Sequence, residues 1–276
     1  MKAHVTSVLS SNDAAKTRPW ICWIPGGPGL SSTTLRSMDL LARSFDMLYV
    51  DPPGTGEAPT LESAPTFNEF VLAIETAIAK EGPRPVILAG HSFGGIVAAE
   101  LILRGKLPAV GYIAAASPLS AESYHEAIQQ CALYKTDVLT AAELAFEQTP
   151  TDETFRNWLS EYGELFFLKS RVTQGRELIR NDRACGRLSM STMEILKNGN
   201  YLKRISDASI PKLFLSGSED KLILPKCISQ EAKACGAQTA TIEGAAHFIS
   251  FDQPETVAGW IEKFFIDGKN ERSKST

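Results

Sequence analysis

The sequence is short of the residues that build metal sites, because it has only four histidines and no H-E-x-x-H motif. We therefore expect neither a metal nor another cofactor. Its five cysteines form no C-x-x-C pair, and two of them, Cys22 and Cys227, fall on predicted core elements. Scattered thiols of this kind are typical of a reducing compartment, so the cysteines predict a cytoplasmic location.

Positive charge and long apolar runs are also scarce. The net charge is −4 and the isoelectric point is about 5.7, which argues against a nucleic-acid-binding surface. No apolar run approaches the length of a membrane span, and the apolar stretch at 5–9 is too short for a signal peptide. The 276 residues, 43% of them hydrophobic, predict a globular protein with a substantial core that binds neither nucleic acid nor membranes.

One stretch organises the rest of the chain. Residues 86–89 form an apolar run with the length of a buried strand, and residues 95–103 are rich in Ala and Leu, as helices are. Between them stands Gly90-His91-Ser92-Phe93-Gly94. A strand that turns directly into a helix strains its middle residue, and the flanking glycines remove side chains that would collide there. The pattern predicts an exposed Ser92 hydroxyl beside the N-terminus of a helix; the alternative is a glycine-rich packing turn.

Strands and helices alternate on both sides of this stretch. Residues 4–9 are predicted to form an early strand. The other predicted strands lie at 20–24, 45–50, 86–89, 109–114, 212–216 and 238–242, and the predicted helices begin near residues 31, 66, 95, 225 and 254. This alternation predicts an α/β fold with a doubly wound, mostly parallel sheet. We expect the polar tail at 268–276 to be mobile.

The alternation stops between residues 118 and 209, a stretch too long for a structureless loop. Two capping-box patterns, Thr140-x-x-Glu143 and Ser191-x-x-Glu194, and an apolar face that includes Phe155 and Leu159 predict helices there. We call residues 118–209 the cap. The sequence thus predicts a core domain, residues 1–117 and 210–276, with a helical cap inserted in it.

A serine needs a neighbouring base before its hydroxyl becomes a nucleophile, and histidine titrates in the right range. His4 lies near the terminus, His125 lies in the cap, and His91 adjoins Ser92, so its side chain should point elsewhere. The remaining candidate is His247, just after the last predicted strand; the alternative for it is a solvated loop position.

The Gly-x-Ser-x-Gly turn and the position of His247 resemble the α/β-hydrolase family, in which nucleophile, acid and histidine follow in that order. The resemblance covers roughly residues 20–265. It implies a catalytic acid in the loop after the strand at 212–216, where Asp220 matches the family pattern and Glu219 is the neighbouring competitor. Some relatives carry the acid after the strand at 109–114, but Ser117-Pro118 offers no carboxylate there.

Within the family, Pro25-Gly26-Gly27-Pro28-Gly29 resembles the His-Gly-Gly-Pro-Gly loop of the proline iminopeptidase branch. The match implies that the backbone N–H groups of Gly27 and Phe93 form the oxyanion hole. The chain departs from that branch in having Pro25 in place of the leading histidine, and its Asp51–Ala58 loop lacks the usual Arg and Ser.

That branch binds the substrate's amine through cap carboxylates, and Glu161 and Glu164, close to several aromatic residues, are candidates for this role. The cap also holds Glu143, Glu147 and Glu153, among others. As an alternative, these carboxylates belong to solvated helix faces.

We therefore expect a serine hydrolase that cleaves an amide or ester bond of a small molecule or short peptide, through Ser92, Asp220 and His247 and an acyl-enzyme. A proline iminopeptidase-like aminopeptidase is the first interpretation. A carboxylesterase, thioesterase or carbon–carbon bond hydrolase is the alternative on the same fold. A non-catalytic ligand receptor and a cofactor-free oxygenase rank below these. A serine at the turn argues against haloalkane dehalogenases and epoxide hydrolases, which carry Asp there.

Overall fold

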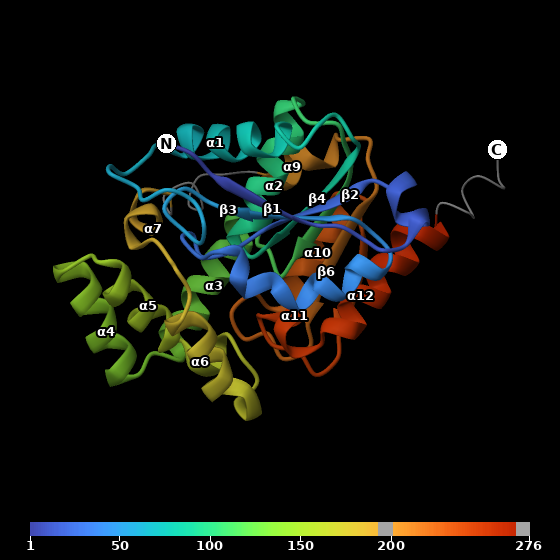
Figure 1. The fold of residues 1–276 in the computed structure, drawn as a ribbon. Coiled ribbons are helices and arrows are strands. Elements are labelled where there is room, and N and C mark those ends of the chain that lie inside the picture. The colour runs from blue at the N-terminus through green and yellow to red at the C-terminus, as the bar shows by residue number, and fades with distance from the viewer. Residues whose placement is uncertain (193–200, 269–276) are drawn as a thin grey trace.

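The structure is a computed structural model, and it describes residues 1–192 and 201–268. A seven-stranded sheet in the order β1-β3-β2-β4-β5-β6-β7 runs through the molecule (Figure 1). β1 pairs with β3 in the antiparallel sense, and all other neighbouring strands are parallel. The strands are β1 (His4–Val8), β2 (Trp20–Ile24), β3 (Met47–Asp51), β4 (Val86–His91), β5 (Ala109–Ala115), β6 (Lys212–Gly217) and β7 (Gln238–Ile242). The predicted mostly parallel sheet, including the early strand expected at 4–9, is confirmed.

Helices cover both faces of the sheet, as the alternation predicted. One apolar cluster joins the sheet to α1 (Phe67–Ala79), α2 (Phe93–Arg104), α9 (Tyr201–Ser206) and α10 (Pro225–Ala234). The opposite cluster joins it to η2 (Ser32–Arg43), α11 (Ile249–Asp252), α12 (Pro254–Glu262) and the π-helical turn η5 (Lys263–Asp267). A short 3₁₀ helix, η1 (Asp13–Thr17), precedes β2. Central strands β2 to β6 are therefore buried from both sides, which explains their continuous apolar sequences.

Of the capping boxes that the sequence suggests, one is present and one is misplaced. The Thr66–Glu69 capping box is present with both of its hydrogen bonds. Thr140, in contrast, lies inside α4 (Asp137–Gln148), whose N-cap is Thr136, so this predicted capping box is wrong. The helix expected at 31–44 is the 3₁₀ helix η2. The predicted capping box at Ser191-x-x-Glu194 is not tested, because Glu194 lies outside the described residues. The tail at 269–276, predicted to be mobile, also lies outside them.

The cap contributes helices that extend from the carboxyl ends of the strands. It contains α3 (Ala121–Leu133), α4, α5 (Asp152–Ser160), η3 (Gly163–Leu165), η4 (Lys169–Arg171), α6 (Val172–Arg180) and α7 (Gly186–Thr192), and α9 also falls within residues 118–209. Helices α4, α5, η3 and α6 contribute to an aromatic-rich cluster that also includes Leu30 and Phe248 from the core, whereas Ala127 of α3 and Leu188 of α7 pack in the cluster of α1 and α2. Each fully buried aromatic side chain of the aromatic-rich cluster contributes about 2–3 kcal/mol relative to exposure. The helical insertion is confirmed, while the division into two domains stays a prediction.

No helix within the described part of the chain combines the length and the apolar character that a membrane crossing requires.

Candidate active site

Ser92 occupies a strained turn between β4 and α2. Its backbone has φ 52° and ψ −122°, a conformation that non-glycine residues rarely adopt. Its N–H donates to the carbonyl of Ala115 on the neighbouring strand over 2.8 Å. A Cβ on Gly90 would overlap the backbone of Gly94, and a Cβ on Gly94 would overlap the carbonyl of Ile24. Both glycines of the motif are therefore required by close backbone approach, as the sequence pattern predicted.

Asp220 and His247 form a buried hydrogen-bonded pair. The Asp220 Oδ2 atom lies 3.0 Å from His247 Nδ1, and each residue is 2% exposed. The other carboxylate oxygen accepts the N–H groups of Leu222 and Ile223, both over 2.9 Å. A carboxylate held in this way accepts the Nδ1 proton, which leaves Nε2 of His247 unprotonated and able to accept a proton. The competitor Glu219 is exposed and takes no part in this pair.

His91 holds the loop that carries His247. Its Nε2 lies 3.0 Å from the His247 carbonyl, so this nitrogen donates the hydrogen bond, and the two imidazole centroids are 4.9 Å apart. Burial is the main cause that lowers the pKa of His91 to about 3, with the proximity of His247 second. Ala246, the residue before His247, is also held in place, because its N–H donates to Asp252 Oδ2 over 2.9 Å. Sequence reasoning placed the His91 side chain away from Ser92 but did not predict this second role.

The buried His91 should make the protein labile in acid. Its pKa is about 3 in the folded chain and about 6.5 when exposed, so between these values the unfolded state binds more protons. The free energy of unfolding should then fall as the pH drops from 6.5 toward 3, by at most about 1.4 kcal/mol per pH unit from this residue. His91→Gln, which retains an N–H donor but does not titrate, should flatten this slope in urea unfolding.

The comparison must be the difference between wild type and His91→Gln, since other buried groups also titrate. Asp182, whose pKa burial raises to about 6, contributes the opposite slope between about 3.8 and 6 in both proteins. Parallel stability curves for the two proteins would contradict a neutral, buried His91.

Ser92 opens into a cavity of about 460 Å³ beneath the cap. The predicted oxyanion-hole residues Gly27 and Phe93 line the same cavity. Gly27 has φ 114°, which a residue with a side chain would adopt only under strain, and a Cβ on Gly26 would lie 3.1 Å from the Ser92 Cβ. The other lining residues are mostly apolar: Pro118, Tyr124, Ala127, Ile128, Cys131, Glu143, Phe146, Glu147, Trp158, Leu159, Tyr162, Phe166, Ser189, Leu222 and Ile223.

The carboxylates at this cavity are not the two that the sequence suggested. Glu161 pairs with Arg176 and Arg180 at 2.9 and 2.7 Å, and neither Glu161 nor Glu164 lines the cavity. Glu143 and Glu147, on successive turns of α4, line it instead. The expectation for Glu161 failed because arginines on α6, distant in sequence, neutralise it. The i, i+4 spacing of Glu143 and Glu147 was visible in the sequence, but the direction of that helix face was not.

Buried acids also fix the loop that contains Gly27. Asp182, which lies in the cap just after α6, accepts the N–H and the hydroxyl of Ser31, while Asp51 accepts the N–H of Ser32 over 2.8 Å. These N–H groups belong to the N-terminus of η2, where negative charge is favoured. The loop that contains Gly27 is thus anchored from β3 and from the cap together. No sequence signal marked Asp182 for this position.

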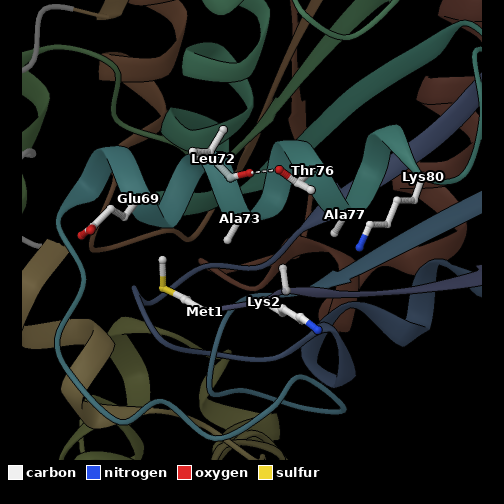
Figure 2. Close-up of a pocket in the computed structure, with 9 residues that line it drawn as sticks. Met1, Lys2, Glu69, Leu72, Ala73, Thr76, Ala77 and Lys80 are labelled. Carbon is white, nitrogen blue, oxygen red and sulfur yellow. Dashed lines mark hydrogen bonds between the residues drawn. The ribbon is translucent and has the colours of Figure 1, made fainter.

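A second hollow, of about 320 Å³, lies between the N-terminal residues and α1. In Figure 2, Met1 and Lys2 face Glu69, Leu72, Thr76 and Lys80 along that helix. It contains none of the residues predicted for catalysis. Over residues 1–192 and 201–268, no group of three or more His, Cys, Asp or Glu side chains is placed to hold a metal ion.

Comparison with known proteins agrees with this architecture. The profile of the alpha/beta hydrolase family matches residues 20–260. The biotin biosynthesis bifunctional protein BioHC of Cellvibrio japonicus is 24% identical over 258 residues, which are 90% of this chain and 48% of that protein. The chain therefore spans about half the length of this curated relative.

Solved structures with the same fold are numerous and differ in their described activities. An esterase from Thermogutta terrifontis superposes with a TM-score of 0.70 at 17% identity, covering 95% of this chain and 92% of the esterase. A proline iminopeptidase from Mycobacterium smegmatis superposes with a TM-score of 0.66 at 18% identity, covering 95% and 94%. Likeness at these identities shows the fold alone. The proline iminopeptidase is one structural neighbour among many, so the narrower resemblance inferred from the glycine-rich loop is not specifically supported.

Proposed function

This chain belongs to the alpha/beta hydrolase family, and we propose that it cleaves an ester or amide bond of a small substrate with Ser92 as the nucleophile. The observation that carries the proposal is the buried Asp220–His247 pair on the loops that follow β6 and β7, together with the strained turn at Ser92. A nucleophile on a strained turn and a base oriented by a carboxylate are the parts that acyl transfer requires.

In the proposed reaction, the Ser92 hydroxyl attacks the carbonyl carbon while His247 Nε2 takes its proton. The tetrahedral oxyanion is stabilised by the backbone N–H groups of Gly27 and Phe93. His247 then donates the proton to the leaving alcohol or amine, and an acyl-enzyme forms. Water attacks this intermediate, again with His247 as the base, and releases the acid. Asp220 stabilises the imidazolium that forms in both steps.

The cavity favours a neutral or cationic substrate over an anionic one. Among the described residues that line it, none is Lys, Arg or His, while Glu143 and Glu147 are carboxylates. Lys135 pairs with Glu143 at 2.6 Å, which leaves Glu147 as the stronger candidate to attract an amine. This lining favours, as one candidate, an aminopeptidase that releases N-terminal residues. The aromatic walls favour a second candidate, a carboxylesterase with an apolar acyl group.

A substrate panel tests the proposal and separates these candidates. The wild type would be assayed with prolyl-naphthylamide, with a thioester and with three p-nitrophenyl esters. The acyl chains of these three esters are equally long and end in a neutral group, an amino group or a carboxylate. We expect turnover of the neutral or amino compounds at about tenfold higher kcat/KM than the carboxylate compound, because Glu147 at the cavity repels a carboxylate and none of the described lining residues is a cation.

The Ser92→Ala protein is the control, and a fluorophosphonate should label the wild type at Ser92 but not this variant. Full turnover by Ser92→Ala would exclude the mechanism. Preference for the carboxylate ester would leave the mechanism standing and overturn the charge argument.

A further inference from the structure

A cap residue lies directly against the imidazole of His247. The ring centroid of Phe166 is 5.6 Å from that of His247, and the two rings are inclined by only 29°. Phe166 is 8% exposed, and its ring also contacts those of Tyr162, stacked at 4.8 Å, of Phe248 at 5.5 Å and of Phe167 at 6.2 Å. The imidazole therefore packs against two rings from the core, those of His91 and Phe248 at 4.9 and 5.9 Å, and against one from the cap, that of Phe166.

The same cap segment also holds the backbone of the histidine loop. The carbonyl of Phe166 accepts the N–H of Phe248, the residue after His247, over 3.1 Å. Five residues further along, the guanidinium of Arg171 lies 4.0 Å from the ring centroid of Phe251 and donates to the carbonyls of Phe251 and Asp252. Residues 166–171 of the cap thus contact the chain from 247 to 252 through a ring, a carbonyl and a cation.

We infer that Phe166 is a positioning residue for His247, through which the cap helps to aim the catalytic base at Ser92; this inference rests on the proposed function. The hydrogen bond that His247 donates to Asp220 fixes only the Nδ1 atom, so the imidazole plane is still free to tilt about that contact. A flat ring packed nearly parallel to the imidazole removes this freedom. Small misplacements of a reacting group reduce catalysis strongly, by about 10²-fold for 1 Å.

Phe166 also lines the cavity, and this second role has a different kinetic signature. A residue that is only a wall affects substrates large enough to touch it, mainly through KM. A residue that positions the base changes the chemical step for every substrate, including the smallest. p-Nitrophenyl acetate separates the two roles, because an acetyl group is small compared with a cavity of about 460 Å³. The labelling rate of Ser92 by a small fluorophosphonate reports activation of the serine in the same way.

The experiment compares Phe166→Ala and the ring-retaining Phe166→Tyr with a matched control, Phe45→Ala. Phe45 is also a buried phenylalanine, but it belongs to the apolar cluster that contains α12 and does not line the cavity. We expect Phe166→Ala to lower kcat on p-nitrophenyl acetate, and the labelling rate, by about 10- to 100-fold with KM nearly unchanged. Phe166→Tyr and Phe45→Ala should stay within about threefold of the wild type in both measurements.

An unchanged kcat and labelling rate in Phe166→Ala, with KM raised only for larger esters, would show a wall and overturn the inference. If Phe166→Ala fails to fold, Phe166→Leu replaces it, because leucine retains most of the buried volume without a flat ring. The same kcat and labelling measurements on Phe166→Leu then distinguish a positioning residue from a wall. The proposed function fails separately: a wild type that is not labelled at all would overturn the serine mechanism, whereas a labelled wild type with an unaffected Phe166→Ala would overturn only the role of Phe166.

Discussion

Replacing Asp220 by asparagine should lower kcat by about 10⁴-fold while the protein stays folded. The asparagine carbonyl can still accept the N–H groups of Leu222 and Ile223, which the carboxylate accepts in the native protein. Its NH₂ group then faces His247 Nδ1, where two donors would oppose each other. The imidazole must shift its proton to Nε2, and in this tautomer Nε2 is unable to accept the proton of Ser92.

Glu219→Gln is the matched control for this prediction. Glu219 precedes Asp220 in the same loop, is exposed, and was the competing candidate for the acid. Its replacement should leave kcat within about twofold of the wild type. Steady-state kinetics on the best ester of the panel measure both variants, with thermal unfolding to verify their folding. An Asp220→Asn enzyme that keeps a tenth of the activity, or an equal loss in Glu219→Gln, would rule out Asp220 as the orienting acid.

The fold could be predicted because its elements have strong local signals. Buried strands such as 20–24 and 86–89 are continuous apolar runs, and the two glycines around Ser92 predict the turn there. The pairing of Asp220 with His247 was also accessible, since family order places both in loops at the same end of a parallel sheet. The apolar runs, the glycine turn and the two loop motifs have in common that each is recognised from a few consecutive residues.

The roles that could not be predicted depend on contacts between segments far apart in the chain. Asp182 reaches Ser31 across 151 residues, and the ring of Phe166 meets His247 only because the cap folds back over the core. The misplaced capping box at Thr140 has a local cause, since Thr136 offered an equivalent N-cap one turn earlier. The amine-binding expectation for Glu161 failed through its ion pairs with arginines of α6, which no spacing rule in the sequence identifies.

Gly94→Ala is the second substitution with a large expected effect, and it acts on the backbone rather than on a catalytic group. An added Cβ would overlap the carbonyls of Ile24 and Pro25, at the start of the loop that contains Gly27. These are backbone atoms at the carboxyl end of a central strand, so they cannot rotate away as a side chain would. The variant should lose about 3 kcal/mol or more of stability, which corresponds to a drop of roughly 10 °C in Tm for a domain of this size.

Gly259→Ala provides the contrast, because a Cβ at that position meets no atom within 4 Å and the residue lies on α12. Alanine is the better helix former, so this variant should gain about 0.5–1 kcal/mol. Calorimetry on both proteins checks the pair, and activity adds a further distinction. Any folded Gly94→Ala should also lose kcat, since the helix that supplies the Phe93 N–H is displaced from the loop that contains Gly27. A Gly94→Ala protein with native Tm and native kcat would show that strand β2 and helix α2 can move apart without loss of stability. The tight turn at Ser92 would then not be what positions the nucleophile.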